Sequence, residues 1–363
     1  MRSRLIVYII LICLQGVNAQ VPEYTRHISR SFHISTSVSV EVSNKYGRIQ
    51  VIHWEKDSVR FDIDLRIKAK DNTKLGKIKQ NIEFDITHGQ SYILAKTRFG
   101  ESGSDVLKDL VDIAGSYLSS QNSVIINYTV RMPAHLNLKI ENKFGDVYLD
   151  DHAGALDLVL SYGDLKANRL IGRSDLKVTS GDADINYLKE ATVIFSYVNA
   201  RVNESSMLNL QSQSSVLNLE KAGNLKLNSR RDKIFLMEGN FISGETYFSL
   251  LNIGTLNNSV SLAGRYGDVI IGNIRRTFTS LNLTSELTDI FLTFEKAMAF
   301  DFDLIHHQAV LFSYPSSLAN LSTSIVNAEQ KLSETTGYFG TSSSPSKVSV
   351  KAVRKCNLTI SQR

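Results

Sequence analysis

The chain has 363 residues, with 41 basic and 36 acidic side chains and a formal net charge of +5. This length is enough for two domains or one long repeat array with a large core. The basic residues are scattered and do not cluster with aromatic residues, which argues against a nucleic-acid-binding protein.

The N-terminus has the pattern of a secretory signal peptide. Arg2 and Arg4 precede an apolar run over residues 5–14, and small or apolar residues lead to Ala19. The run is too short to span a bilayer as a helix, although an N-terminal membrane anchor is the alternative. We therefore predict a signal peptide over residues 1–19 and an extracytoplasmic protein, in the periplasm or on the cell surface. Cleavage would remove two arginines and lower the net charge from +5 to +3.

No later segment has 18 or more consecutive apolar residues, so we expect no membrane-spanning segment in the mature chain. The predicted mature chain keeps one cysteine, Cys356, and cannot form an internal disulfide. Because Cys356 lies in the alternating stretch of residues 348–360, it is expected to be a small buried side chain.

A repeat begins near residue 136. Its first turns fall at Gly145, Gly163 and Gly181, 18 residues apart, and later units are about 16–21 residues long. A period in this range is typical of a stacked array, in which each unit buries its apolar face only against its neighbours.

Each unit alternates with period two, as half-buried strands do. Before the Gly163-Asp164 turn, the alternation predicts an inward face formed by Leu156, Leu158, Leu160 and Tyr162. After this turn, Leu165 and Ala167 resume the inward face. We infer a β-solenoid and call each unit a rung. The left-handed hexapeptide helix is the alternative, but it requires an apolar residue every six positions.

The segment "NKYGRIQV", residues 44–51, returns as "NKFGDVYL", residues 142–149. We interpret the two as corners of neighbouring rungs, with the residues between them leaving the stack and returning. Residues 105–118 have an amphipathic helical pattern, and residues 73–86 have a weaker one. The first helix is expected to cap the end of the stack, and the alternative is a membrane-surface helix. The predicted fold is thus all-β, a single-domain β-solenoid over 132–363 preceded by 20–131, which hold strands and a small helical insertion or cap.

Two segments resemble a known family. "VEVSNKYGRIQVIHW" and "INYTVRMPAHLNLKIENKFGDVYL", followed by "SYGDL"-type rungs, are similar to exported β-solenoid proteins of unknown function named putative adhesins, common in Bacteroidetes-type bacteria. The resemblance covers residue 36 to the C-terminus. It implies an extracytoplasmic, surface-associated protein and no particular ligand, cofactor or catalytic residue.

Four turns place an aspartate after glycine, and in register their carboxylates would form a ladder on the surface: Asp146, Asp164, Asp182 and Asp268. We expect these to be turn residues that accept backbone N–H groups. A Ca²⁺-binding edge is the alternative.

Other candidates are weaker. Asp150, Asp151 and His152 are expected to form a solvated corner, although paired carboxylates also serve glycoside or lyase chemistry. His306 and His307 lack further ligands at metal-binding spacing. Aromatic residues recur at equivalent corners, where the alternation places them in the core and the alternative is a glycan-stacking ladder on the surface: Tyr46, Phe144, Tyr162, Tyr197 and Tyr266.

The sequence therefore predicts an exported, non-enzymatic scaffold or adhesin-like binding protein without a cofactor. Its partner would be an extended glycan or protein and not a nucleic acid. The alternatives are a carbohydrate-active β-helix enzyme and a periplasmic envelope-stress component.

Overall fold

The computed structural model describes residues 21–34, 37–100, 122–340 and 345–363. This part of the chain is nearly all β, in one 20-stranded sheet, which confirms the all-β class. The predicted signal peptide and the predicted helix at 105–118 lie outside the described residues. Within the described ranges, no helix is long and apolar enough to cross a membrane.

The elements are β1 (Glu23–His33), β2 (Ser39–Lys45), β3 (Ile49–His53), β4 (Ser58–Lys68), α2 (Asn72–Gln80), β5 (Ile82–His88), β6 (Tyr92–Phe99), β7 (Ser123–Met132), β8 (Asn137–Lys143), β9 (Val147–Leu149), β10 (Leu156–Ser161), β11 (Leu165–Gln213), β12 (Val216–Arg230), β13 (Lys233–Ile274), β14 (Ser280–Phe294), β15 (Phe300–His307), β16 (Leu311–Ser313), the 3₁₀ turn η2 (Ser316–Leu318), β17 (Ala319–Asn327), β18 (Leu332–Phe339), β19 (Lys347–Ala352) and β20 (Asn357–Gln362).

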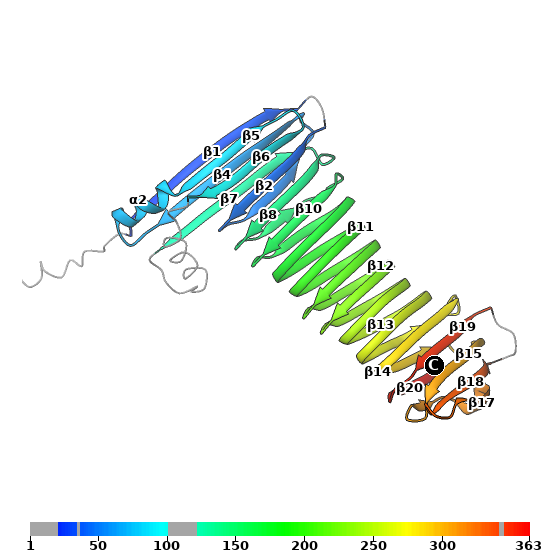
Figure 1. Ribbon diagram of the computed structural model, residues 1–363. Helices are drawn as coiled ribbons and strands as arrows, with labels where there is room; N and C mark the ends of the chain where they lie inside the picture. Colours follow the sequence, from blue (N-terminus) through cyan, green and yellow to red (C-terminus); the bar gives the residue numbers. More distant parts are fainter. Residues whose placement is uncertain (1–20, 35–36, 101–121, 341–344) are drawn as a thin grey trace, which may run out of the picture.

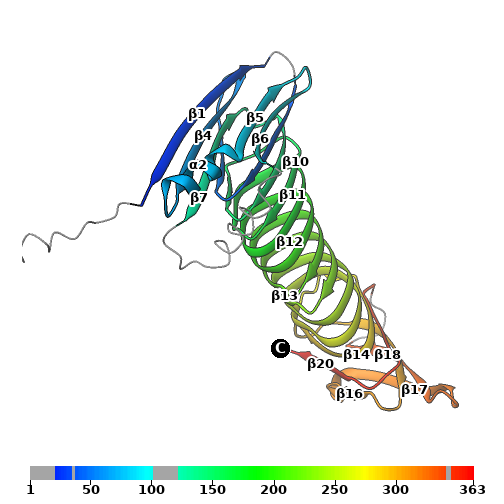
Figure 2. The same cartoon turned by 60° about the vertical axis from the view of Figure 1, so that its left-hand side comes forward.

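From β8 to β14 the chain pairs in parallel with itself one turn later, and we call residues 137–294 the stack. Leu158 of β10 lies opposite Ile140 of β8 on one side and opposite Leu176 of β11 on the other. Further along, β12 pairs in parallel with β11 and β13 at a constant offset of 17 residues. Figures 1 and 2 show the result, a row of bent strands (green to yellow) between two end regions.

The alternating side chains make a continuous core inside the stack. Leu158 and Leu160 are fully buried, whereas Asp157 and Val159 between them are exposed. Each fully buried aliphatic side chain stabilises the fold by about 1.5–3 kcal/mol. Leu165 and Ala167 are also buried, as the alternation predicts.

The repeated "NK-aromatic-G" segments lie side by side although 98 positions separate them. Asn44 and Lys45 of β2 pair with Asn142 and Lys143 of β8. The buried Asn142 amide donates to the carbonyls of Gly145, at 2.8 Å, and of Gly47, at 2.9 Å. The asparagine therefore satisfies corner carbonyls on two rungs, and the prediction of neighbouring corners is confirmed.

The residues between these two corners build the N-terminal end of the molecule, the blue and cyan region of Figure 1. β6 pairs in parallel with β2, and β7 pairs in parallel with β3. β5 and β4 then add to them antiparallel, and β1 adds antiparallel to β4. Parallel pairing thus gives way to antiparallel pairing at this end.

The weak helix expected over 73–86 forms only in its first part, as α2. The Asp71 side chain caps it by accepting from the backbone N–H of Lys74 at 2.7 Å. Residues 82–88 instead form β5, because they pair antiparallel with β6.

The C-terminal strands are inserted between earlier ones. β19 lies between β14 and β15, with Val348 opposite both Leu281 and Phe302. β20 lies likewise between β14 and β16. β18 and β17 then continue antiparallel beyond β15. Cys356, in the loop between β19 and β20, is buried as predicted.

Gly145 provides a test of the close approach between rungs. A Cβ on Gly145 would lie 2.1 Å from the Gly47 carbonyl oxygen, whereas one on Gly76 of α2 would meet nothing within 4 Å. We expect Gly145→Ala to lower the free energy of unfolding by about 1–3 kcal/mol. Gly76→Ala should raise it by up to about 1 kcal/mol, because alanine favours the helix. Urea unfolding of both variants checks this, and equal stability of the two would contradict the packing described.

Candidate functional site

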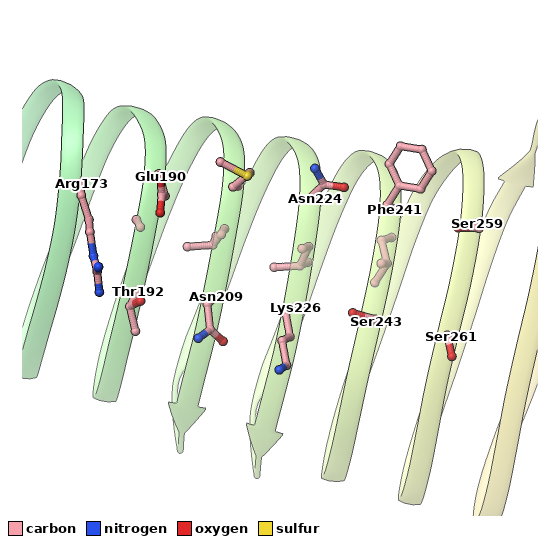
Figure 3. Close-up of a pocket in the computed structure, with 15 residues that line it drawn as sticks. Arg173, Glu190, Thr192, Asn209, Asn224, Lys226, Phe241, Ser243, Ser259 and Ser261 are labelled. Atoms are coloured by element: carbon pink, nitrogen blue, oxygen red, sulfur yellow. The ribbon is translucent and has the colours of Figure 1, made fainter.

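A shallow groove runs along the outer face of the stack, across successive turns of β11, β12 and β13 (Figure 3). Its volume is about 530 Å³, and it shares Lys226, Ser243 and Ser261 with a second hollow of about 490 Å³ that reaches β14, β15 and β19. The groove is lined by Arg173, Glu190, Ala191, Thr192, Met207, Leu208, Asn209, Asn224, Leu225, Lys226, Phe241, Ile242, Ser243, Ser259 and Ser261.

The 17-residue offset builds this groove from columns of equivalent residues. Leu208, Leu225 and Ile242 form a buried floor, each opposite the next in the parallel register. The residues before and after each floor residue alternate outward. One flanking column is Met207, Asn224 and Phe241, and the other is Asn209, Lys226 and Ser243.

Three polar side chains of the groove are available to a ligand, whereas Arg173 is ion-paired with Asp175. Within the described residues, the side chains of Asn209, Asn224 and Lys226 have no hydrogen-bond or ion-pair partner. The asparagines elsewhere on the stack behave differently, since Asn186 donates to Asn168 at 2.6 Å and Asn203 donates to Asn186 at 2.9 Å. The asparagines of that ladder hydrogen-bond to one another. Asn209, Asn224 and Lys226 of the groove do not bond in this way.

The same flanking column also exposes apolar surface. Met207 and Phe241 are each 46% exposed and lie on either side of Asn224. Strands in a sheet are about 4.8 Å apart, so the two side chains are about 10 Å apart along the stack. The sequence analysis did not single out these residues. In the sequence, Met207 and Phe241 are marked only as apolar residues at outward-facing positions of a strand. Such positions can be identified only when the register of the strands is known.

The first three predicted aspartates form a hydrogen-bonded ladder at one corner. The backbone N–H of Asp164 donates to Asp146 Oδ1 at 3.0 Å, and that of Asp182 donates to Asp164 Oδ1 at 2.9 Å. Asp268 lies further along the stack, where it pairs with Asp289 of β14. Among the described residues, no three His, Cys, Asp or Glu side chains are placed to hold a metal ion.

The cluster of Asp150, Asp151 and His152 is not uniformly solvated. The two aspartates are exposed, but the His152 side chain is 1% exposed and stacks on His53, with ring centroids 5.2 Å apart. The expectation of a solvated corner is therefore wrong for His152, because the alternation of the chain turns it inward. Burial, and then the neighbouring His53, lowers the pKa of His152 to about 4. Burial also lowers the pKa of His53.

His306 and His307 take part in local hydrogen bonds. His306 Nε2 lies 3.1 Å from Thr335 Oγ1 of β18, and the backbone N–H of Ala309 donates to His307 Nδ1 at 3.1 Å.

The expectation that the corner aromatic residues are core is wrong for three of them. Tyr162 is 53% exposed, Tyr197 is 61% exposed and Tyr266 is also exposed, whereas Tyr46 is buried. All of these residues have a positive φ of 56–67°, which interrupts the alternation. Tyr46 is nevertheless buried, because Phe99 and Phe144 pack against its ring. This left-handed conformation costs a non-glycine residue about 1–2 kcal/mol.

The comparisons with known proteins gave the following results. No protein-family model matches the chain, and no curated protein matches it. Among solved structures, a putative cell adhesion protein from Clostridium sporogenes is 8% identical, with a TM-score of 0.18, over 94% of this chain and 100% of its own. A putative adhesin from Bacteroides fragilis is 12% identical, with a TM-score of 0.24, over 93% of this chain and 97% of its own. A putative adhesin from Parabacteroides distasonis is 11% identical, with a TM-score of 0.25, over 73% of this chain and 94% of its own. Superpositions at these scores do not place the chain in a family.

The buried histidine gives a pH prediction. His152 has a folded-state pKa of about 4, below the unfolded value of 6.5. The unfolded chain therefore binds more protons, and stability present above pH 6.5 is lost as the pH falls toward 4. We expect a loss of about 3 kcal/mol between pH 7 and pH 4 from this residue. Urea unfolding of wild type and His152→Gln across this range measures it. The same loss in the variant would contradict the assignment, and His27→Gln, at an exposed position, is the control.

Proposed function

We propose that the chain is an exported, non-enzymatic β-solenoid that binds an extended ligand, in an adhesin-like or scaffold role at the cell envelope. Residues 1–19 are the signal peptide, 20–131 the N-terminal strands with their insertion, and 132–363 the solenoid. The parallel pairing of each turn with the next, at an offset of 17 or 18 residues, supports the solenoid.

The observation that carries the binding role is the open groove along the stack. Its polar side chains repeat at the spacing of the strands, and Met207 and Phe241 add apolar contact at its edge. A compact ligand would touch only part of such a surface. An extended chain lying along the stack would meet the same kind of contact on each rung.

The residues that favoured a carbohydrate-active enzyme have other roles. Asp151 accepts a hydrogen bond from the side-chain amide of Asn168. Burial lowers the pKa of His152 to about 4 and keeps its side chain neutral at physiological pH. These contacts favour binding over acid–base catalysis.

The groove is tested by substitutions at its edge and centre. Phe241→Ser and Lys226→Glu should each weaken binding about tenfold, since they remove apolar contact and a hydrogen-bond donor. The matched controls are Phe235→Ser and Lys221→Glu, whose side chains are exposed and line neither the groove nor the second hollow. The secreted full chain is immobilised and titrated with extended polypeptides such as gelatin. Equal affinity of groove and control variants would reject the groove as the site.

Export has its own test. The chain expressed in its own host should be found outside the cytoplasm with Gln20 as its N-terminus, as determined by mass spectrometry. Protease added to intact cells should remove a C-terminal tag if the stack is on the surface. A retained N-terminal segment with a cytoplasmic tag would contradict the proposed export.

A further inference from the structure

The stack, together with the neighbouring turn between β2 and β3, bends at one corner through a residue of positive φ on every rung, and we call these residues the corner column. They are Tyr46, Phe144, Tyr162, Ser180, Tyr197, Ser214, Arg231, Phe248, Tyr266 and Leu287. None is a glycine, although glycine adopts this conformation without strain. Six of the ten are aromatic, so large side chains occupy a backbone conformation that disfavours them.

At the N-terminal end of the corner column three rings stack on one another. The centroids of Tyr46 and Phe144 are 5.5 Å apart with planes 6° apart, and those of Phe144 and Tyr162 are 5.1 Å apart with planes 17° apart. These neighbours cover the faces of Phe144. The next position is Ser180, which is too small to cover the following face of Tyr162.

Tyr162 and Tyr197 therefore flank a slot above Ser180. They are two rungs apart, which places them about 10 Å from each other along the stack. Both are more than half exposed. A planar base between two rings would need only about 7 Å, twice the 3.4 Å stacking distance. A sugar ring is thicker than a base, and its C–H faces pack on aromatic rings, so the slot fits a pyranose better.

The polar groups beside the slot also favour a sugar. Asp164 and Asp182 follow Tyr162 and Ser180 by two residues, and each uses at most one oxygen within the ladder. Their remaining oxygens can accept from hydroxyl groups but would repel a polyanion. On the other side of Tyr162, the Lys143 ammonium lies 5.8 Å from its ring centroid and is not ion-paired to any described carboxylate.

A second group of exposed rings lies five rungs further on, where two rings stack directly on each other without a slot between them. Phe248 and Tyr266 stack with centroids 4.6 Å apart, and the Arg230 guanidinium lies 5.6 Å from the ring of Tyr247. The distance from Tyr162 to Phe248 along the stack is about 24 Å. A ligand that reaches both groups of rings must be a chain of several sugar units.

We propose that the corner column binds a linear neutral polysaccharide, with one sugar ring between Tyr162 and Tyr197 and further rings near Phe248 and Tyr266. This site is separate from the groove and names a ligand class that the groove does not specify.

Isothermal titration of the secreted full chain tests this site. The probes are soluble linear β-glucan, mannan and pullulan, with polygalacturonate and oligothymidylate as polyanions. At least one neutral polymer should bind, with an affinity that changes little between about 0.05 and 0.5 M salt. Tyr197→Ser should weaken this binding about tenfold. Serine already occupies this corner at Ser180 and Ser214, so the variant is expected to fold. Tyr197→Trp should keep binding, because it preserves an aromatic face.

The control Tyr92→Ser removes a tyrosine that is similarly exposed but lies on β6, away from the corner column. The proposal is overturned if no neutral polymer binds, if Tyr197→Ser binds as well as Tyr92→Ser, or if a polyanion binds more tightly. Loss of binding in Phe241→Ser alone would assign the polymer to the groove instead.

Discussion

The structure depends on the close, in-register contact between the backbone of one turn and that of the next. This contact is tightest at the corners, where Gly145 lies against Gly47 and Gly163 lies against Gly145, with no room for a side chain. Parallel pairing at a constant offset aligns the side chains of each turn with those of its neighbours. Buried positions then form a continuous apolar core, and outward positions form continuous columns on the surface.

The same constraint explains how polar residues are used. Where a corner carbonyl is buried, a side chain must satisfy it, and Asn142 does so for two rungs. In a later corner, the buried Asp232 accepts from the hydroxyls of Ser212 and Ser229. Polar side chains that hydrogen-bond to one another between rungs stabilise the stack. Columns whose side chains have no hydrogen-bond partner within the described residues, such as that of Asn209 and Lys226, are the ones that can bind a ligand.

The two ends of the molecule differ from its middle because a parallel stack leaves unpaired backbone groups at its last strand. At the N-terminal end β4 and β5 change the pairing to antiparallel, and the outermost strand, β1, carries Arg26 and Arg30. At the C-terminal end β18 and β17 make the same change. Charged residues on an edge strand disfavour pairing with another chain, which protects the N-terminal edge.

The sequence by itself determined the all-β class, the alternation of Leu158 and Leu160 with exposed residues, and the adjacency of the two "NK-aromatic-G" corners, because these follow from local periodicity and internal repetition. Only the tertiary structure decided which corner aromatic residues face solvent, since that depends on the neighbouring rings, and Phe99 and Phe144 cover Tyr46. It also decided the burial of His152 against His53, the insertion of β19 between β14 and β15, and the groove at Phe241. Each of these depends on the register between distant segments, which no local pattern specifies.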